Sequence, residues 1–520
     1  MNNTSKFTVA ICGGGVGGLI CAVALSRYEN IQVDIYEAAQ HFAEIGAGIG
    51  MWPRAWKIMK SLGLDRDLGD IAIVPPDNHP KVAFNFRKGD QPEGLSFYTL
   101  ETPGGMISFH RAEFHNVLLR HLSPSCRTHC RKRLVSYSQP VSSSSYDPHT
   151  FLRPPVKLRF QDGTTAHCDL LIGADGVKSA VRMSLVHELS ASARAGGRTH
   201  DAEDLLRAAE PRWSGMSAYR ATIPAETLRM RLPGHRVLTD PMVYFGKNTQ
   251  MTVYPISRGT IINFAAFRAC YDLEHTTFDA PWVQDVPLDE LFDDFARWEP
   301  EVQALFQCVR KINRWAIHTS APLPSFVSGR VALLGDAAHA MMPFQGAGAG
   351  QAIEDAYVLS TLLGHRRATR ATLPRVLQVY DAVRRPFAQR VAESSRENGM
   401  LYTLNFPGLT FDAPVYDADA EKLAEIRARI RMNWEWAWRR AWMGTSSARC
   451  VCWRAGMNGM GVFGDSILNT WFAAIIRNID QMWNELLMNS EYRYFTTTTV
   501  QNYYEVAVCS PSSDRLTQLL

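Results

Sequence analysis

The sequence predicts an α/β fold in which a Rossmann-like parallel sheet is assembled from segments far apart in the chain. Residues 7–37 read as a strand, a glycine-rich turn, a helix and a second strand, which is one βαβ unit. Residues 331–334 form an apolar run that ends on a glycine and an aspartate. Between them, residues 186–325 show alternating patterns such as MTVYPI, typical of a half-buried sheet. We therefore expect a discontinuous Rossmann-like domain, an inserted mixed-sheet domain and a helical C-terminal region.

These patterns divide the chain into segments, which in order are residues 1–72, 73–99, 100–185, 186–325, 326–400, 401–443 and 444–520. The first, third and fifth are expected to form the Rossmann-like domain, and the second and fourth a substrate-facing layer. The sixth is expected to be a C-terminal helix and the last an atypical tail. Within the tail, the apolar positions of residues 467–487 fit one helical face, which favours packing on the domain or a partner over peripheral membrane contact.

Composition is that of an ordinary globular protein. Of 520 residues, 46% are hydrophobic and 20% charged, and the 55 basic and 51 acidic residues are interspersed. No nucleic-acid-binding surface is expected, and partners should be small molecules. The start reads as a strand rather than a secretory signal, no apolar run is long enough for a membrane span, and the scattered cysteines lack zinc-site spacing. We expect a cytoplasmic protein with reduced thiols and no metal.

Local patterns add detail to this organisation. Residues 135–155 are rich in Ser and Pro and read as an exposed loop. Asp162-Gly163 lies between two short strand patterns and predicts a hairpin, followed by a buried strand at 170–172. Residues 44–64 contain a second glycine-rich stretch that leads into a helix, and residues 288–306 read as an acidic helical stretch.

A dinucleotide-binding fingerprint lies in the first turn. Gly13, Gly15 and Gly18 fit the pattern G-x-G-x-x-G between strand and helix, and Glu37 follows the next strand. The first glycine makes the tight turn, the second admits a pyrophosphate, and the third lets the helix pack closely on the strand. Glu37 can accept a hydrogen bond from a ribose hydroxyl. A glycine-rich packing turn alone would not explain Glu37, so an adenine dinucleotide is expected.

A second carboxylate indicates which dinucleotide this is. Asp336 ends the 331–334 strand, at the edge where open parallel sheets bind ligands. A nicotinamide dinucleotide needs only one fingerprint, whereas the ribityl hydroxyls of a flavin require a further acceptor. The glycine run at 346–350 then offers backbone N–H groups at a helix start, where the negative charge of a reduced flavin is stabilised. FAD is the expected cofactor.

Together these residues resemble the FAD-dependent aromatic-ring monooxygenases of the salicylate hydroxylase type, including fungal enzymes of secondary metabolism. The glycine fingerprint with Glu37, the stretch DLLIGADGVKSAVR (169–182) and the stretch GRVALLGDAAHAMMP (329–343) occur in the family's order. The likeness extends over about residues 7–442. The resemblance implies that one atom of O2 is inserted into a substrate and that NAD(P)H is a transient co-substrate.

The resemblance also implies roles for further residues. Gly50 would approach the cofactor from the second glycine stretch, and Arg111 would face its ribityl-phosphate region. Ala349, beside Gly348, would face the isoalloxazine edge. Asp175, with Arg182, would support the cleft through which the nicotinamide cofactor passes.

Two positions depart from the family pattern. Relatives commonly read Pro-His-Gln-Gly where this chain has Phe344 as the second residue, and Gln250 stands where another histidine is common. Because a phenol hydroxylase benefits from a nearby base, usually histidine, their absence favours a neutral substrate. By resemblance, Arg220 and Tyr254 would orient it.

The sequence therefore predicts an NAD(P)H-consuming monooxygenase that acts on an apolar aromatic or polyketide-like intermediate, by hydroxylation or by epoxidation with rearrangement. The alternatives are a decarboxylating hydroxylase of the salicylate 1-hydroxylase type and, from another class, a catalytically silent flavin-binding protein. An NAD-dependent dehydrogenase is a weaker alternative. The substrate, the choice between NADH and NADPH, the oligomeric state and the role of the tail stay open.

Overall fold

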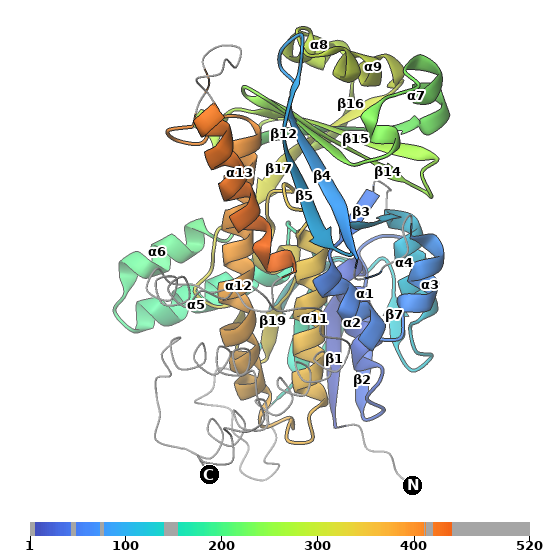
Figure 1. Cartoon of the computed structure of the whole chain (residues 1–520). Helices are drawn as coiled ribbons and strands as arrows, with labels where there is room; N and C mark the ends of the chain where they lie inside the picture. Colours follow the sequence, from blue (N-terminus) through green and yellow to red (C-terminus); the bar gives the residue numbers. More distant parts are fainter. Residues whose placement is uncertain are drawn as a thin grey trace, which may run out of the picture.

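The computed structural model describes residues 6–42, 48–72, 77, 79–139, 154–409, 411 and 420–438. These residues form two main sheets, one above the other in the view of Figure 1. The two longest helices, α11 (Gly348–Gly364) and α12 (Leu373–Tyr402), run beside the lower sheet. The predicted segment 467–487 and the tail 444–520 lie outside the described residues.

The lower sheet has six strands in the order β18-β19-β11-β1-β2-β7. Their bounds are β1 Phe7–Cys12, β2 Ile31–Tyr36, β7 Arg127–His129, β11 Leu170–Gly173, β18 Val327–Ser328 and β19 Val331–Leu333. The central strands are parallel, with Val9 opposite Leu170 and Leu171 opposite Val331. Strands far apart in sequence are thus neighbours, and the predicted discontinuous α/β fold is confirmed.

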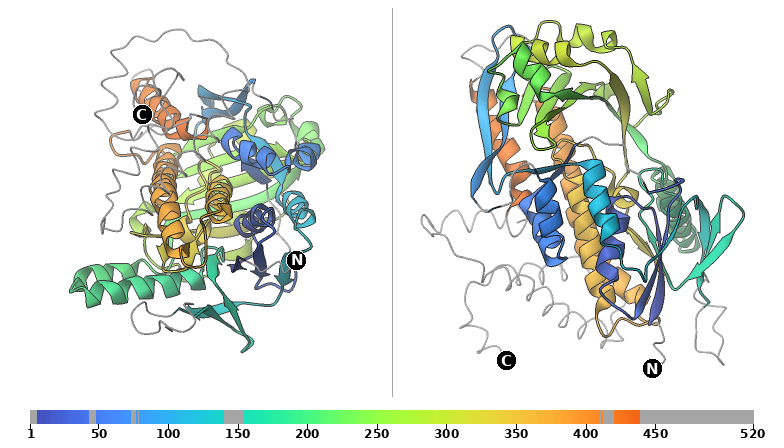
Figure 2. Two further views of the ribbon diagram at one scale, coloured as in Figure 1. Left: turned by 90° about the horizontal axis from the view of Figure 1, so that it is seen from below. Right: turned by 90° about the vertical axis from the view of Figure 1, so that its right-hand side faces the viewer.

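Helices cover this sheet because their apolar faces require burial. The bounds are α1 Val16–Leu25, α2 Pro53–Ser61, α3 Asp65–Ile71, α4 Arg111–Arg120, α5 Ala180–Ala195, α6 Thr199–Arg207, α10 Asp336–His339, α11 Gly348–Gly364 and α12 Leu373–Tyr402. Helix α1 packs against α11, and both contribute to one core with the strands. Helices α5 and α6 project to one side of the molecule (Figure 2).

The upper sheet has eight strands in the order β16-β17-β12-β15-β14-β13-β4-β5. Their bounds are β4 Pro80–Lys88, β5 Leu95–Pro103, β12 Arg212–Pro224, β13 Met242–Gly246, β14 Thr249–Ile256, β15 Ile261–Ala269, β16 Val283–Val286 and β17 Ile312–Thr319. The sheet is mixed: β13 and β4 are parallel, and all other neighbouring strands of this sheet are antiparallel.

Each face of the upper sheet has its own core. Helices α7 (Ala225–Arg231), α8 (Asp289–Phe295) and α9 (Pro300–Cys308) cover the outer face. The inner face packs against α12 and α13 (Ala420–Trp434) through an aromatic cluster. This alternation follows from the strand geometry, which sends successive side chains to opposite faces.

Smaller elements complete the fold. Strands β3 (Gly48–Met51) and β6 (Ile107–His110) pair with each other, and β8 (Leu134–Ser138), β9 (Val156–Phe160) and β10 (Thr165–Cys168) form a three-stranded sheet. The predicted hairpin at Asp162-Gly163 is confirmed by the pairing of β9 with β10. Single turns of 3-10 helix span Arg236–Leu238, Tyr271–Leu273 and Glu435–Ala437.

One local prediction was wrong, and another is confirmed. Residues 135–138, expected in an exposed loop, belong to strand β8. The side chains of Leu134 and Tyr137 in this strand are buried in the core. The predicted helical character of residues 288–306 is confirmed, and the stretch consists of two helices, α8 and α9, with Pro300 as the first residue of α9.

Candidate functional site

A cavity of about 710 Å3 lies at the carboxyl ends of β1, β11 and β19 and reaches the inner face of the upper sheet. The predicted positions that line it are Gly13, Gly15, Glu37, Gly50, Arg111, Asp175, Arg220, Tyr254, Asp336, Gly348 and Ala349. Gly18 and Arg182 lie behind its wall. The fold thus brings together residues that are up to 336 positions apart in the sequence, from Gly13 to Ala349.

The glycine turn at the end of β1 leaves no room for side chains. A Cβ on Gly13 would lie 2.1 Å from the Ala174 carbonyl oxygen, and one on Gly18 would lie 2.0 Å from that of Gly13. Gly13 also has φ +108°, which favours glycine. Gly18 therefore acts as the helix–strand packing glycine, while the turn itself faces the cavity.

Glu37 is held in place by backbone donors. Its Oε2 accepts a hydrogen bond from the Gly14 N–H and its Oε1 from the Ala39 N–H, both at 2.7 Å. Each oxygen keeps a second lone pair that a ribose hydroxyl can use. His115, whose Nε2 lies 2.9 Å from the Gly14 carbonyl oxygen, supports the same turn from α4. Sequence reasoning missed His115, because its partner is a backbone atom 101 residues away.

Asp336 presents a carboxylate to the cavity. It is exposed, whereas the residues on both sides of it, Gly335 and Ala337, are buried. No described residue makes a hydrogen bond or ion pair with its carboxylate oxygens, which therefore remain available to hydroxyl donors. An unpaired carboxylate at this position is consistent with the predicted role of Asp336 as an acceptor for ribityl hydroxyls, which stays a prediction.

The N-terminus of α11 faces the same cavity. Gly346, Ala347, Gly348 and Ala349 all line it, and α11 is 17 residues long. The N–H groups of its first turn have no partner inside the helix, and the helix dipole adds partial positive charge there. This end stabilises negative charge, so the arrangement fits the pyrimidine end of a flavin, with Asp336 nearby for the ribityl chain.

A buried ion network holds the turn that carries Asp336. Asp355 in α11 is fully buried, and its Oδ2 accepts hydrogen bonds from the Gly335 N–H at 3.0 Å and from His339 Nε2 at 2.6 Å. Its Oδ1 accepts from Arg384 Nε at 2.7 Å. Burial by itself raises the pKa of Asp355, but His339 and Arg384 outweigh burial and lower that pKa to about 2.

Sequence reasoning missed this network, although it offered one signal. Glu354 and Asp355 are two adjacent acids within the otherwise apolar start of α11, where unpaired charges could not be buried. Glu354 accepts from Arg384 Nη1 at 3.0 Å and from Arg54 Nε at 2.7 Å. The partner arginines lie in α12 and α2, so their identity could not be read from the local sequence.

Asp175 and Arg182 both support the cavity wall structurally. Asp175 accepts hydrogen bonds from Ser179 Oγ and from the Ala180 N–H at 2.8 Å, which caps α5. Arg182 donates to the carbonyl oxygens of Ala338, at 3.1 Å, and of Ala208, at 3.0 Å. Burial lowers the pKa of Arg182 to about 10. Their predicted part in admitting a nicotinamide cofactor stays a prediction.

The far end of the cavity is lined by Arg220, Tyr254, Met341 and Met342. Burial lowers the pKa of Arg220, which the phenol of Tyr254 partly opposes, and burial raises the pKa of Tyr254. The raised pKa keeps the phenol of Tyr254 neutral at neutral pH. The guanidinium carbon lies 5.5 Å from the centroid of the Trp315 ring, and no described residue forms a hydrogen bond or ion pair with the guanidinium group.

The two positions that lack histidine are not in the cavity wall. Phe344 is 5% exposed and packs in the aromatic cluster against Phe267, with ring centroids 5.0 Å apart. A Cβ on Gly399 would lie 2.6 Å from the Phe344 ring, so this ring requires a glycine in α12. Gln250 is fully buried beside the same cluster. Both residues thus shape the floor beneath the site.

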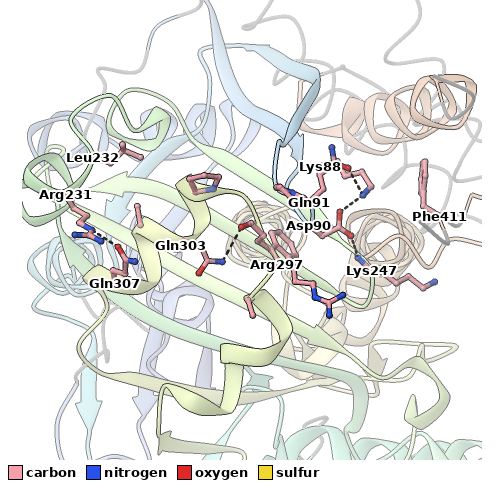
Figure 3. Close-up of a pocket in the computed structure, with 15 residues that line it drawn as sticks. Lys88, Asp90, Gln91, Arg231, Leu232, Lys247, Arg297, Gln303, Gln307 and Phe411 are labelled. Carbon is pink, nitrogen blue, oxygen red and sulfur yellow. Dashed lines mark hydrogen bonds and ion pairs between the residues drawn. The ribbon is translucent and has the colours of Figure 1, made fainter. Parts of the chain in front are cut away.

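A second cavity, of about 1040 Å3, lies on the outer face of the upper sheet, away from the glycine turn (Figure 3). Two of its charged groups have partners: Lys88 pairs with Asp90, and Arg231 donates to Gln307. Among the described residues there is no cluster of His, Cys, Asp and Glu that could hold a metal ion, and no helix suited to crossing a membrane.

The comparisons with known proteins agree with this geometry. Residues 6–227 and 276–395 match the family model described as FAD binding domain. The chain is 37% identical to FAD-dependent monooxygenase str9 of Strobilurus tenacellus over 83% of this chain and 95% of that protein. It is 37% identical to a salicylate hydroxylase of Pseudomonas putida over 84% of this chain and 93% of that protein. The chain belongs to the family of FAD-dependent monooxygenases.

The structural comparison supports the same assignment. A solved salicylate hydroxylase–substrate complex superposes with a TM-score of 0.67 and 31% sequence identity, over 83% of this chain and 96% of that one. FAD is the cofactor of this monooxygenase, and the predictions of family, enzyme class and cofactor are confirmed. The individual residue assignments at the cavity stay predictions.

Replacing Asp336 with Ala should weaken FAD binding by about tenfold or more, because the ribityl hydroxyls lose a charged acceptor. The dissociation constant can be measured by quenching of flavin fluorescence as apoprotein is added. Asp204→Asn, a surface change in α6, serves as the control and should leave the affinity unchanged. Equal affinity in the wild type and the Asp336→Ala variant would contradict the assignment.

Asp355→Asn should lower the free energy of unfolding by about 3 kcal/mol, because the buried cation of Arg384 loses a charged partner. Urea unfolding of the apoprotein measures this loss. Since the pKa of Asp355 is lowered to about 2 in the folded protein, its contribution is present above the pKa of an unfolded aspartate and is lost as pH falls toward 2. The wild type should therefore lose stability more steeply than the variant below about pH 4.

Proposed function

We propose that this monooxygenase consumes NAD(P)H and inserts one atom of O2 into an apolar aromatic or polyketide-like intermediate of secondary metabolism. The reaction is ring hydroxylation or epoxidation with rearrangement. One observation carries the choice of substrate: among the described residues that line the cavity there is no histidine, and its carboxylates, Glu37, Asp175 and Asp336, are on the cofactor side. Without a base at the far end, a substrate that need not lose a proton is the better fit.

In this proposal, one set of residues binds FAD and another orients the substrate. When bound, FAD would accept two electrons from NAD(P)H and pass them to O2, so that one oxygen atom is inserted into the substrate and the other is released as water. The glycine turn and Glu37 hold the adenosine end, Asp336 holds the ribityl hydroxyls, and the α11 N-terminus stabilises negative charge at the ring. Met341, with Met342, supplies an apolar wall that excludes water from the reacting face.

Arg220 and Tyr254 would orient the substrate from the upper sheet. They lie on β12 and β14, two strands separated only by β15, and both face the cavity. Tyr254, kept neutral by burial, can donate a hydrogen bond to a carbonyl, ether or hydroxyl oxygen of the substrate. The cation of Arg220 can do the same with a stronger, charge-assisted bond.

Arg220 also supports a second candidate, a decarboxylating hydroxylase of the salicylate type. A partly buried guanidinium in the cavity wall, without an acidic partner among the described residues, is suited to a substrate carboxylate. The relative from Pseudomonas putida is named a salicylate hydroxylase. The two candidates therefore differ in the group that Arg220 would contact. It is a neutral oxygen of the substrate in the first candidate and a carboxylate in the second.

A cytoplasmic location is part of the proposal. The described cysteines are Cys12, Cys21, Cys126, Cys130, Cys168, Cys270 and Cys308, and all are free thiols. Free thiols are typical of a reducing compartment, which also contains the NAD(P)H that the reaction requires.

Purified holoenzyme should oxidise NADH or NADPH faster when anisole or stilbene is added as a neutral probe, and should form an oxygenated product. With salicylate it should form little catechol. Oxygen consumption and product analysis by mass spectrometry measure both outcomes. Substrate-stimulated conversion of salicylate to catechol would favour the second candidate, and absence of oxidation with every probe would contradict the activity.

Arg220→Met should raise the KM for a productive neutral probe by about tenfold, because one charge-assisted hydrogen bond is lost while the side-chain volume is similar. For a carboxylate substrate the same variant should lose more than about a hundredfold in kcat/KM, since the substrate charge would be left unpaired in the cavity. The ratio of the two losses, from steady-state kinetics, therefore distinguishes the two candidate functions.

A further inference from the structure

The turn that leads into α11 is held by parts of the chain far from it in sequence. It spans residues 343–346 and closes with a hydrogen bond from the Gly346 N–H to the Pro343 carbonyl oxygen at 3.0 Å. Pro343 and Gly346 line the cavity, and α11 begins two residues later. The position of the turn therefore sets where the helix N-terminus lies relative to the bound cofactor.

Gln345 is the residue through which the turn is held. It is fully buried, and its main-chain carbonyl oxygen accepts a hydrogen bond from Trp52 Nε1 at 2.8 Å. Its side-chain Nε2 donates to the carbonyl oxygen of Asn433 at 2.7 Å. Asn433 in turn donates from Nδ2 to Asn398 Oδ1 at 3.0 Å. These bonds connect the turn to α2, α12 and α13, in a region shielded from water, where they are strongest.

Aromatic packing fixes the same arrangement. The rings of Trp52 and Trp434 meet edge to face, with centroids 4.6 Å apart. Trp434 Nε1 donates to Tyr402 Oη at 3.1 Å, so α13 is also bound to the end of α12. Each of these three residues is at most 2% exposed. Helix α13 therefore packs closely against α12, as Figure 1 shows.

Helix α13 lies outside the part of the chain that matches the family model, which ends at residue 395. We infer that α13 is nevertheless a working part of the active site: through Asn433 and Gln345 it positions the 343–346 turn, and with it the α11 N-terminus that stabilises negative charge on the flavin. Gln345 and Trp52 are positioning residues, since they act on the cofactor through the turn. The inference depends on FAD binding and is independent of the substrate.

The test uses sulfite, which adds to oxidised flavin and leaves negative charge at its pyrimidine end. Its affinity for the holoenzyme, followed by bleaching of the visible flavin band, reports how well that charge is stabilised. Gln345→Met removes the amide donor at nearly constant volume, and Trp52→Phe removes the indole donor but keeps a ring. Each should weaken sulfite binding by about 3- to 10-fold, as expected for a displaced helix N-terminus.

Gln303→Met is the matched control, because it removes an amide that also donates to backbone carbonyls, those of Phe295 and Trp298, on the outer face of the upper sheet (Figure 3). It should leave sulfite affinity unchanged. The thermal midpoint of each apoprotein separates positioning from general loss of stability. If Gln345→Met does not fold, Trp434→Phe takes its place, because it removes the α13 indole donor to Tyr402 Oη but keeps a ring.

The inference is overturned if both active-site variants bind sulfite as tightly as the wild type, even with lower thermal midpoints. It is also overturned if Gln303→Met weakens sulfite binding to the same extent. Neither outcome bears on the proposed substrate, because no substrate is present in the assay.

Discussion

The site depends on one buried carboxylate. Asp355 accepts hydrogen bonds from Gly335, His339 and Arg384, and so fastens a turn with φ +60° at Gly335 that places Asp336 at the cavity. A charge with no access to water is tolerated only when it is fully paired, and three donors satisfy it here. The Asp336 carboxylate can therefore stay unpaired and face the cavity, because the bonds to Asp355 hold the turn in place.

The two sheets contribute different chemistry to the same cavity. The parallel sheet ends in a glycine turn and a helix N-terminus, which suit the phosphates and the anionic ring of a cofactor. The mixed sheet supplies side chains alone, among them Arg220 and Tyr254, through the alternation of its strands. The parallel sheet thus contributes backbone groups together with the carboxylates of Glu37 and Asp336, whereas the mixed sheet contributes side chains alone.

The sequence was sufficient where the determinants are local. The glycine spacing, Glu37 and Asp336 could be predicted because each follows directly from a strand end, and the family motifs added Arg220 and Tyr254. The ion pair of Asp355 and the side-chain hydrogen bond of Gln345 could not be predicted. Their partners, Arg384 and Asn433, lie 29 and 88 residues away in the sequence. Phe344 shows the limit most clearly: its motif places it beside the site, but only tertiary packing sends its ring into the aromatic cluster.

The order of strands in the lower sheet has a consequence for synthesis. Residue 9 pairs with residue 170, and residue 171 with residue 331, so the centre of this sheet closes over two intervals of about 160 residues. Pairings of such long range are slow to form and leave apolar strands exposed meanwhile. A nascent chain cannot complete the flavin cleft until most of it has left the ribosome, so chaperone supply and translation speed should govern the yield of active protein.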